Sequence, residues 1–432
     1  MQTVKFFTLG CKVNQYDTQL LREKLLAFAD FREIENNHPS DIYIINTCTV
    51  TASADKESFE LIRRAKKENP LALIIVTGCL AELDSEKIKD IDNKIVILKN
   101  KEKKDLLKKL SITNYTNYQL PFTEQPSISY FKGHTRAFLK IQEGCNNFCS
   151  YCKVPLVRGK SRSKNPDLII KEFNTLIKNG YKEIVLCGIC LGDFGKDLKP
   201  KMELIELLER LDSLEGDFRM RLSSIEAWDI TENFIQNINK IKKLCPHLHI
   251  PLQSGDDQIL KLMNRPINSQ GYLEIIKRLK EKIPSLVFTT DVLVGFPQEK
   301  EENFLNTLKL IKEIKPLKVH IFSFSPRLYT KAYLLGGKVN DKEIKKRFNL
   351  LKEIAREQSL EVKTTFLGKQ VRVLFESFSV KNQELFWEGF ADNYIKVKVS
   401  SRKDLRNRFV KVYLESIEDN YMLGSIGEGD LL

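Results

Sequence analysis

The feature that most constrains the fold is a regular alternation of short apolar runs with amphipathic stretches. In residues 1–100, each of three apolar runs is followed by a segment whose apolar residues have helical spacing. A strand followed repeatedly by a helix predicts a parallel sheet with helices packed on its faces. The strand candidates are "VKFFTLG" (4–10), "DIYIINTCTV" (41–50) and "LALIIVTGCL" (71–80), and the helix candidates are 16–28, 54–68 and 85–91.

The alternation returns with longer units from residue 134 to about 365. Six candidate strands with intervening helices fit a full or partial β/α barrel, whose active site would lie at the carboxyl ends of the strands. A doubly wound sheet would show the same periodicity, so both architectures remain open. The strand candidates are 136–142, 183–189, 218–225, 247–252, 286–296 and 318–324.

The remaining segments lack this rhythm. Residues 101–133 are polar in their second half and contain two prolines, which is typical of a linker. The tail has short strands of alternating polarity without helices between them, which predicts a small β-barrel similar in architecture to the OB fold. Its basic and aromatic residues favour RNA binding. The alternative is a purely structural role, in which the module covers a neighbouring domain. The tail's strand candidates are 369–376, 386–399, 408–416 and 421–428, and the cations expected to meet RNA are Lys396, Lys398, Arg402 and Arg408.

We therefore expect an α/β chain with three domains. The first, at 1–125, would be a flavodoxin-like parallel sheet, and the second, at 130–366, a partial or full β/α barrel. The third, at 367–432, would be the all-β module. A length of 432 residues agrees with several domains, because single cores rarely grow so large.

Composition narrows the class of protein. The chain has 70 Lys and Arg against 57 Asp and Glu, a net charge of +13, which favours a polyanionic partner such as nucleic acid. A generally lysine-rich proteome would give the same excess. The start resembles no secretory signal, and the longest apolar stretch is too short to span a bilayer. We expect a cytoplasmic protein without a membrane segment, in which nine cysteines serve as metal ligands or reactive thiols rather than disulfides.

The densest chemistry lies in "EGCNNFCSYC" (143–152), which contains Cys145, Cys149 and Cys152. A structural zinc site takes four ligands, and an ordinary iron–sulfur cluster takes four cysteines. Three thiolates on a [4Fe–4S] cluster leave one iron open to bind a small molecule. The alternatives are a zinc knuckle completed by a distant ligand such as His134, or chance buried thiols.

Cys11, Cys48 and Cys79 form a second set, because each ends or follows a predicted strand of the first domain. Successive strand ends of a parallel sheet lie side by side, so the three thiols can converge. Independent burial of three cysteines in the core is the alternative. Convergence would create a second cluster site with an open iron.

These motifs resemble those of the radical S-adenosylmethionine (SAM) enzymes, and the pair of cysteine sets resembles the methylthiotransferase branch. The resemblance covers nearly the whole chain and ends in a TRAM-like module from about 367. It implies that Cys145, Cys149 and Cys152 hold a [4Fe–4S] cluster whose open iron binds SAM, which is cleaved to a 5′-deoxyadenosyl radical. It also implies that a second [4Fe–4S] cluster on the other three thiols holds the sulfur.

Within that branch, "TLGCKVNQYDT" (8–18), "NTCTVT" (46–51) and "CPHLHIPLQSG" (245–255) look most like the enzymes that modify N6-threonylcarbamoyladenosine in tRNA. Sister groups modify isopentenyladenosine in tRNA or an aspartate of a ribosomal protein. Much of the distinction depends on the residues after the first cysteine, which are Lys12, Val13, Asn14 and Gln15.

The resemblance implies addition of a methylthio group to C2 of the base beside the anticodon. Its partners would be SAM, the tRNA anticodon stem-loop and an electron donor such as flavodoxin or ferredoxin, and the protein would be a monomer. The rival from another class is a non-catalytic, zinc-binding RNA-binding protein with two three-cysteine knuckles.

Other stretches match family positions that line the SAM pocket. The residues expected there are Gly188, Ser223, Ser224, Glu226, Gln253, Asp291 and Gly295. The sequence also departs from the family pattern. Cys190 stands where the family usually has Asn and forms a C-x-x-C with Cys187, which we expect to be two incidental thiols. Gln298 replaces a glycine, "SPRLYT" (325–330) lacks a Pro-Gly before Thr330, and "LRNRF" (405–409) lacks a turn glycine.

Overall fold

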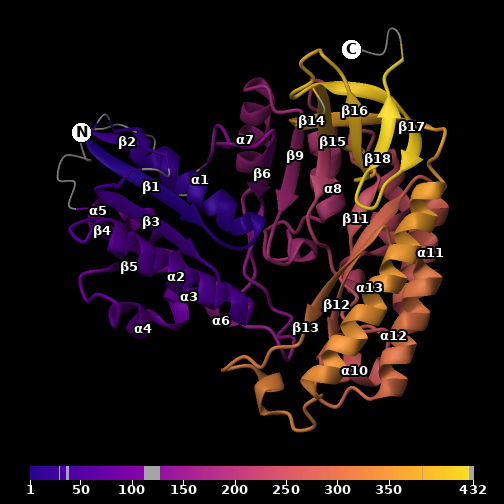
Figure 1. Ribbon diagram of the computed structural model, residues 1–432, viewed down its shortest axis with the longest axis horizontal. Helices are drawn as coiled ribbons and strands as arrows, with labels where there is room; N and C mark the ends of the chain where they lie inside the picture. The colour runs from indigo at the N-terminus through magenta and orange to yellow at the C-terminus, as the bar shows by residue number, and fades with distance from the viewer. Residues whose placement is uncertain (29, 36–37, 111–126, 382, 428–432) are drawn as a thin grey trace.

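The computed structural model describes residues 1–28, 30–35, 38–110, 127–381 and 383–427, and it has three parts (Figure 1). An N-terminal sheet with its helices lies beside a central set of parallel strands wrapped by helices. A small β-barrel, drawn in yellow, sits at one end of the central part. Within the described ranges, none of the helices combines the length and apolarity that crossing a bilayer requires.

The N-terminal sheet is parallel, with the strand order β2-β1-β3-β4-β5. This is the flavodoxin-like order, so the predicted fold of this part is confirmed. All six residues of β3 are buried, as expected for a central strand covered on both faces. The elements are β1 (Gln2–Thr8), α1 (Lys12–Leu26), β2 (Phe31–Glu33), β3 (Ile42–Thr47), α2 (Ala52–Glu68), β4 (Leu73–Gly78), α3 (Cys79–Leu83), α4 (Ser85–Lys89) and β5 (Val96–Leu98).

The predicted linker is wrong at its start. Residues Asn100–Asp105 form a 3₁₀ helix and Leu106–Lys109 form α5. Leu106 and Leu107 are buried against the N-terminal core, so this stretch is part of the first domain because its apolar pair has a surface to cover. The rest of the predicted linker up to residue 126 lies outside the described residues.

The central part contains six parallel strands that follow one another in sequence order. One sheet has the order β10-β9-β6, the other β11-β12-β13, and single bridges join β10 to the β11 segment. No pairing between β6 and β13 occurs in the described ranges, so the barrel is partial and open between those strands. All six predicted strands are present, as β6 (Arg136–Lys140), β9 (Glu183–Cys187), β10 (Arg219–Leu222), β11 (His247–His249), β12 (Val287–Val294) and β13 (Lys318–Ser323).

Helices cover the outside of these strands and form the largest core with them. Their starts follow from local sequence: α7 begins after Asn165, whose side chain accepts the first free N–H groups, and Pro166 occupies its first position. The helices are α6 (Val154–Arg158), α7 (Pro166–Lys178), α8 (Leu204–Asp212), α9 (Glu232–Asn237), α10 (Asp257–Leu262), α11 (Ser269–Lys282), α12 (Glu301–Ile314) and α13 (Asp341–Thr364).

The tail folds into a closed barrel with the order β14-β15-β16-β18-β17. The segment 386–399, expected as one strand, is two strands separated by a turn. Tyr394 lies at φ +70°, and the Ala391 N–H donates to the Ile395 carbonyl, which reverses the chain there. The strands are β14 (Gln370–Lys381), β15 (Glu384–Ala391), β16 (Lys396–Ser400), β17 (Phe409–Ile417) and β18 (Met422–Ser425).

This C-terminal barrel covers the amino ends of the central strands. Arg219 and Arg221 at the start of β10 donate to Asp392 and to backbone carbonyls of the β15–β16 turn. Both arginines also pair with buried Glu183 at the start of β9. Burial would raise the pKa of Glu183, but these two guanidinium groups hold it well below its usual range. The C-terminal barrel therefore leaves the carboxyl ends of the strands uncovered, and these ends face the N-terminal sheet.

Candidate active site

Cys11, Cys48 and Cys79 follow the carboxyl ends of β1, β3 and β4, which are neighbours in the sheet. Cys48 and Cys79 are each 5% exposed, whereas Cys11 is exposed. The three thiols lie within electrostatic range of one another. The sheet topology thus brings together the cysteines that are 37 and 31 residues apart in sequence.

The backbone around these thiols is closely packed. Gly10 lies at φ +91°, and a Cβ atom there would be 2.8 Å from the Cys48 sulfur. Glycine therefore permits the close approach of the β1 end to Cys48. Burial raises the pKa of Cys48 to about 11, so it stays protonated at neutral pH unless a cation such as a metal binds.

Cys145, Cys149 and Cys152 lie in the loop between β7 (Gln142–Glu143) and α6, directly after the first barrel strand. All three are partly exposed. The backbone N–H groups of Asn147 and Val154 each donate to a thiol, at 3.4 Å from the sulfurs of Cys145 and Cys152. Backbone donors to sulfur suit thiolates that carry negative charge, as cluster ligands do.

In the described residues, neither cysteine set is preformed as a site for a single metal ion. In the described part of the chain, the groups of three ligand atoms that all lie within 4.8 Å of one another include neither set. Thiolates around one zinc, with bonds of about 2.3 Å, would be about 4 Å apart. Burial also raises the pKa of Cys152 to about 12, so that thiol needs a bound cation to ionise.

The proposed fourth zinc ligand, His134, is not near the cysteine loop. It precedes β6 at the amino end of that strand, and its ring packs against Phe131 and Phe138 at 5.3 and 5.7 Å. Burial lowers its pKa. The expectation that His134 could complete a zinc knuckle is therefore wrong.

Arg158, the last residue of α6, connects the two cysteine sets. Its guanidinium donates to Asp17 at 2.9 Å, to Glu143 at 3.0 Å and to the Asn14 side chain. Burial raises the pKa of Cys79 and the nearby Arg158 lowers it. Arg158 thus lies between the loop that carries Cys145, Cys149 and Cys152 and the Cys79 thiol of the N-terminal domain.

Lys103 and Lys140 extend this buried network through ion pairs with Asp17. Removing one partner from such a network leaves a buried charge uncompensated, which is costly. The sequence did not reveal these contacts, because they join residues more than 80 positions apart. The sequence signal that could have indicated Arg158 is the dipeptide "RG" (158–159) shortly after the cysteine loop.

Cys187 and Cys190 have different neighbours, so they do not form the redox pair that their spacing could suggest. Cys187 is buried at the end of β9 within electrostatic range of Cys11. Cys190 accepts from the Asn147 side chain at 3.4 Å and lies 3.6 Å from an oxygen of Asp229. Each thiol is adjacent to one of the cysteine sets rather than incidental to the site.

Most of the expected SAM-pocket residues lie at the carboxyl ends of the barrel strands. Glu226 pairs with Arg265 at 2.6 Å. Burial raises the pKa of Cys149 and Cys152, and the negative charge of Glu226 raises both pKa values further. Gln253 lies at φ +72° and bridges to β12.

Three more of these residues lie near that rim. Gly188 follows β9, where a Cβ atom would be 2.8 Å from the Gln142 side chain. Ser223 follows β10, and its buried hydroxyl has no hydrogen-bond partner among the described residues. Ser224 forms the bridge to His249.

Gly295 directly follows β12, and protein atoms occupy the space beside it. A Cβ atom on it would be 2.4 Å from Ile344 of α13, and its N–H donates to Glu299 at 2.8 Å. It therefore permits packing of α13 rather than access of a ligand. Nearby Gln298 lies at φ +69°, a conformation that explains why a glycine is usual at this position.

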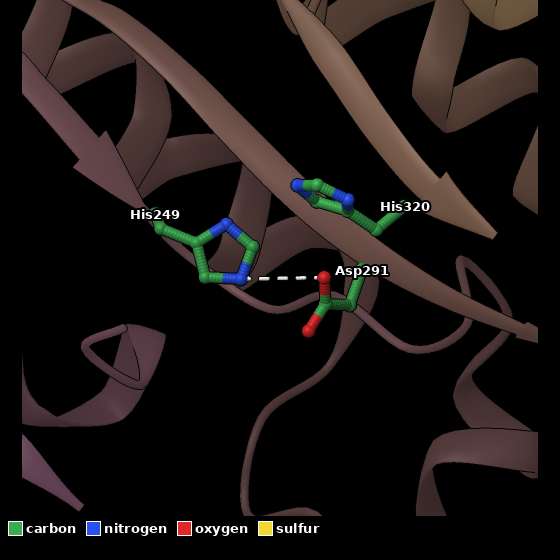
Figure 2. A group of neighbouring side chains, drawn as sticks. All are labelled: His249, Asp291 and His320. Atoms are coloured by element: carbon green, nitrogen blue, oxygen red, sulfur yellow. Dashed lines mark ion pairs between the residues drawn. The ribbon is translucent and has the colours of Figure 1, made fainter. Parts of the chain in front are cut away.

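Asp291 belongs to a polar group inside the barrel (Figure 2). Its carboxylate pairs with the His249 ring at 3.3 Å, and His320 lies beside both. His247 and His249 both contact the Thr289 hydroxyl, so the two histidines share one face of β11. His247 also stacks on Tyr394 of the C-terminal barrel at 4.4 Å. The sequence analysis missed His320.

Arg327 of the "SPRLYT" loop is committed to a contact with the N-terminal domain. It is 7% exposed and donates to the Thr49 carbonyl at 3.0 Å, to the Thr49 hydroxyl at 3.2 Å and to Asp55. The loop therefore anchors the segment that follows Cys48. One guanidinium nitrogen of Arg327, Nη2, makes all of these contacts with the N-terminal domain.

Family models match both parts of this site. Residues 139–311 match the Radical SAM superfamily, and residues 3–99 match Uncharacterized protein family UPF0004. A Bacillus subtilis protein described as threonylcarbamoyladenosine tRNA methylthiotransferase MtaB is 37% identical, covering 95% of this chain and 93% of the relative. A Clostridium botulinum tRNA-2-methylthio-N(6)-dimethylallyladenosine synthase is 36% identical, covering 87% and 86%.

Solved structures share the fold at low sequence identity. The cobalamin-dependent radical SAM enzyme OxsB, with aqua-cobalamin and S-adenosylmethionine bound, has a TM-score of 0.53 and 14% identity, covering 82% of this chain and 56% of that one. The radical SAM methyltransferase TsrM from Kitasatospora setae has a TM-score of 0.54 and 10% identity, covering 77% of each chain.

Proposed function

Because this chain belongs to the family of radical SAM methylthiotransferases, we propose that its substrate is N6-threonylcarbamoyladenosine beside the anticodon of tRNA. The product would carry a methylthio group on C2 of that base. The relative with this name is matched over nearly the full length of both chains. Clostridium synthases named for dimethylallyladenosine are matched at 34–35% identity over 94% of this chain, and they define the alternative substrate.

The observation that supports this function is the meeting of the two cysteine sets. Arg158 belongs to the helix that follows Cys152 and contacts Asn14 and Asp17 of the N-terminal domain. Cys187 of the barrel lies within electrostatic range of Cys11. The sulfur held by the N-terminal cysteines and the radical formed at the barrel cysteines would thus be next to each other, at the carboxyl ends of the strands.

The roles of the residues follow from their positions. Cys145, Cys149 and Cys152 would hold a [4Fe–4S] cluster that, when bound, supplies one electron for cleavage of SAM. Cys11, Cys48 and Cys79 would hold a second [4Fe–4S] cluster that carries the sulfur. Two SAM molecules would be used, one as methyl donor and one as radical source.

The other groups of the site would position and screen these parts. Buried Arg265 pairs with partly exposed Glu226, and this pair would orient SAM at the strand ends. Ser223, whose hydroxyl has no protein partner in the described ranges, would donate to it. The buried charges around Arg158 would exclude water and keep the two cysteine sets in fixed register.

An electron donor such as flavodoxin or ferredoxin and the tRNA anticodon stem-loop complete the proposed partners of a cytoplasmic monomer. The net charge of +13 supports a nucleic-acid substrate over the ribosomal-protein aspartate. Nothing in this charge distinguishes the two adenosines, so the choice between them depends on the relatives and on the residues after Cys11.

Deleting the gene tests the substrate. Nucleoside mass spectrometry of total tRNA should show loss of the methylthio mark only on threonylcarbamoyladenosine, with the unmethylthiolated precursor accumulating. The methylthio form of isopentenyladenosine and the ribosomal protein should be unaltered. Loss of the isopentenyl product, with the threonylcarbamoyl product intact, would assign this protein to the alternative substrate.

A further inference from the structure

His249, Asp291 and His320 form a group of metal-ligand types inside the barrel (Figure 2). They lie on β11, β12 and β13, and one ligand atom from each residue lies within 4.8 Å of the other two. The strand register produces this group: Thr289 pairs with His249, Asp291 pairs with His320, and residues two apart on a strand point to the same face. All three side chains are partly exposed, so an ion can reach them from solvent.

The His249 ring is held in a fixed orientation by two contacts. Its Nδ1 atom lies 2.8 Å from the Thr289 hydroxyl, and its Nε2 atom lies 3.3 Å from the Asp291 carboxylate. A metal-bound histidine commonly donates its second ring N–H to an oxygen, which fixes the ring and leaves the other nitrogen to the ion. Thr289 supplies such an oxygen here, so Nε2 of His249 can bind an ion on the side of Asp291.

His320 is the member of the group that a simple ion pair leaves unexplained. Its ring meets the His249 ring edge-on, with centroids 5.6 Å apart. In the part of the chain that the structure describes, it forms no hydrogen bond, and the Asp291 side chain pairs with His249 alone. A cation held among the three side chains would give the His320 ring a partner.

Two lysines oppose the binding of a cation, but both act from outside the group. Lys12 and Lys318 lie within electrostatic range of His320. Neither forms an ion pair with Asp291 within the described ranges, and Lys318 is exposed, so water screens its charge. Because Coulomb energy falls with distance, direct contact of an ion with the Asp291 carboxylate outweighs repulsion from these more distant charges.

We propose that His249, Asp291 and His320 bind a divalent transition-metal ion such as Mn²⁺, Fe²⁺ or Zn²⁺. Two imidazoles and one carboxylate suit such ions, and three protein ligands leave further coordination positions open. Bonds of about 2.0–2.2 Å would place the ligand atoms about 3 Å apart, which small side-chain rotations achieve from the present spacing. The ligands are nitrogen and oxygen, so the site is chemically distinct from the six cysteines that would hold the clusters.

A cavity of about 690 Å³ gives access to this site at His320. It is bounded by β13, α13 and the C-terminal barrel, and Thr289 also contributes to its wall. Among the described residues that line it, none is a cysteine, so an ion can enter without passing the cluster sites. Water or another oxygen donor from this cavity would fill the open positions of the ion.

Binding of Mn²⁺ tests the site independently of methylthiolation. The protein is reconstituted with both clusters in their oxidised, diamagnetic state and is titrated anaerobically with MnCl₂, without SAM or RNA. Electron paramagnetic resonance (EPR) measures the free Mn²⁺, and pulsed EPR detects nitrogen coupled to the bound ion. The proteins are the wild type, Asp291→Asn, His320→Gln and His38→Gln, which removes an exposed histidine of the N-terminal domain as a matched control. Iron content and thermal unfolding show whether each variant keeps its clusters and fold.

We expect the wild type and His38→Gln to bind one Mn²⁺ with nitrogen coupling. Loss of one ligand should weaken binding by about tenfold or more in Asp291→Asn and His320→Gln, and the nitrogen coupling should decrease in His320→Gln. Because His320 has no hydrogen bond to lose in the described ranges, His320→Gln decides the matter even if Asp291→Asn unfolds. A wild type without bound Mn²⁺, or a folded His320→Gln that binds it as tightly as the wild type, overturns the site.

Discussion

At the scale of single residues, the two cysteine sets should fail independently. Cys149→Ala should lose about half of the irons, about four of eight, and should no longer cleave SAM. Cys48→Ala should lose a similar number but keep SAM cleavage, because its loss leaves the barrel loop intact. Iron analysis and 5′-deoxyadenosine formation in the anaerobically purified variants measure both results.

Cys245→Ala is the matched control for these variants. Cys245 is buried near Arg219 and Arg221 at the amino end of the barrel and belongs to neither set. It should retain all the irons. Normal methylthiolation by Cys48→Ala would make Cys11, Cys48 and Cys79 ordinary core residues.

At the scale of elements, the loop between β16 and β17 of the C-terminal barrel carries several exposed cations. Lys396 and Lys398 both pair with Glu388, at 2.6 and 2.5 Å, so they are poorer candidates for phosphate contacts than expected. Arg402, Arg406 and Arg408 lie in the exposed segment between β16 and β17 and make no ion pair within the described ranges. This segment is the better candidate for RNA binding.

Replacing these three arginines by Gln should weaken the salt dependence of tRNA binding. The slope of the logarithm of the binding constant against the logarithm of the salt concentration should fall by about one for each lost phosphate contact. Filter binding at a series of salt concentrations measures the slope. Replacing the exposed lysines 171, 178 and 240 on the outside of the barrel removes the same charge and should leave the slope unchanged. An equal slope for wild type and the arginine variant would make this module a structural cap.

Deleting residues 367–432 is a poorer experiment than these substitutions. The module covers Arg219, Arg221 and Glu183, whose charges are buried at its contact with the barrel. Its removal would expose Phe and Val side chains of the interface as well as this charge cluster. Loss of tRNA binding by such a fragment could not be separated from loss of structure.

At the scale of the whole molecule, function requires that the N-terminal sheet and the barrel keep a fixed relation. Arg327 joins the loop after β13 to Thr49 and Asp55 beside Cys48. Arg327→Gln should therefore leave both clusters in place and reduce the methylthiolated product about 10²-fold, because small misplacements of reacting groups are that costly. The amounts of product and of 5′-deoxyadenosine per enzyme measure this uncoupling.

Arg356→Gln is the control for that variant. Arg356 pairs with Asp419, but its side chain is 74% exposed, and exposed pairs contribute about 0–1 kcal/mol. Its product and iron content should match the wild type. An Arg327→Gln protein that makes product at the normal rate would show that the two parts keep their relation without this contact.

The sequence by itself determined the main strands of the first two domains and the placement of both cysteine sets at strand ends. Apolar runs followed by amphipathic segments define buried strands and the helices that cover them, so all six barrel strands could be predicted. Cys11, Cys48 and Cys79 could be placed together because parallel strands end at one edge, a rule that needs only the strand order.

Only the tertiary structure decided which side chains meet between the domains. The contacts of Arg158 with Asp17 and of Arg327 with Asp55 join residues far apart in sequence. Periodicity records which face of an element is buried, but it carries no information about the partner across an interface. For the same reason the sequence does not show that His134 packs against Phe131, away from the cysteine loop, or that Lys396 and Lys398 share Glu388 as a partner.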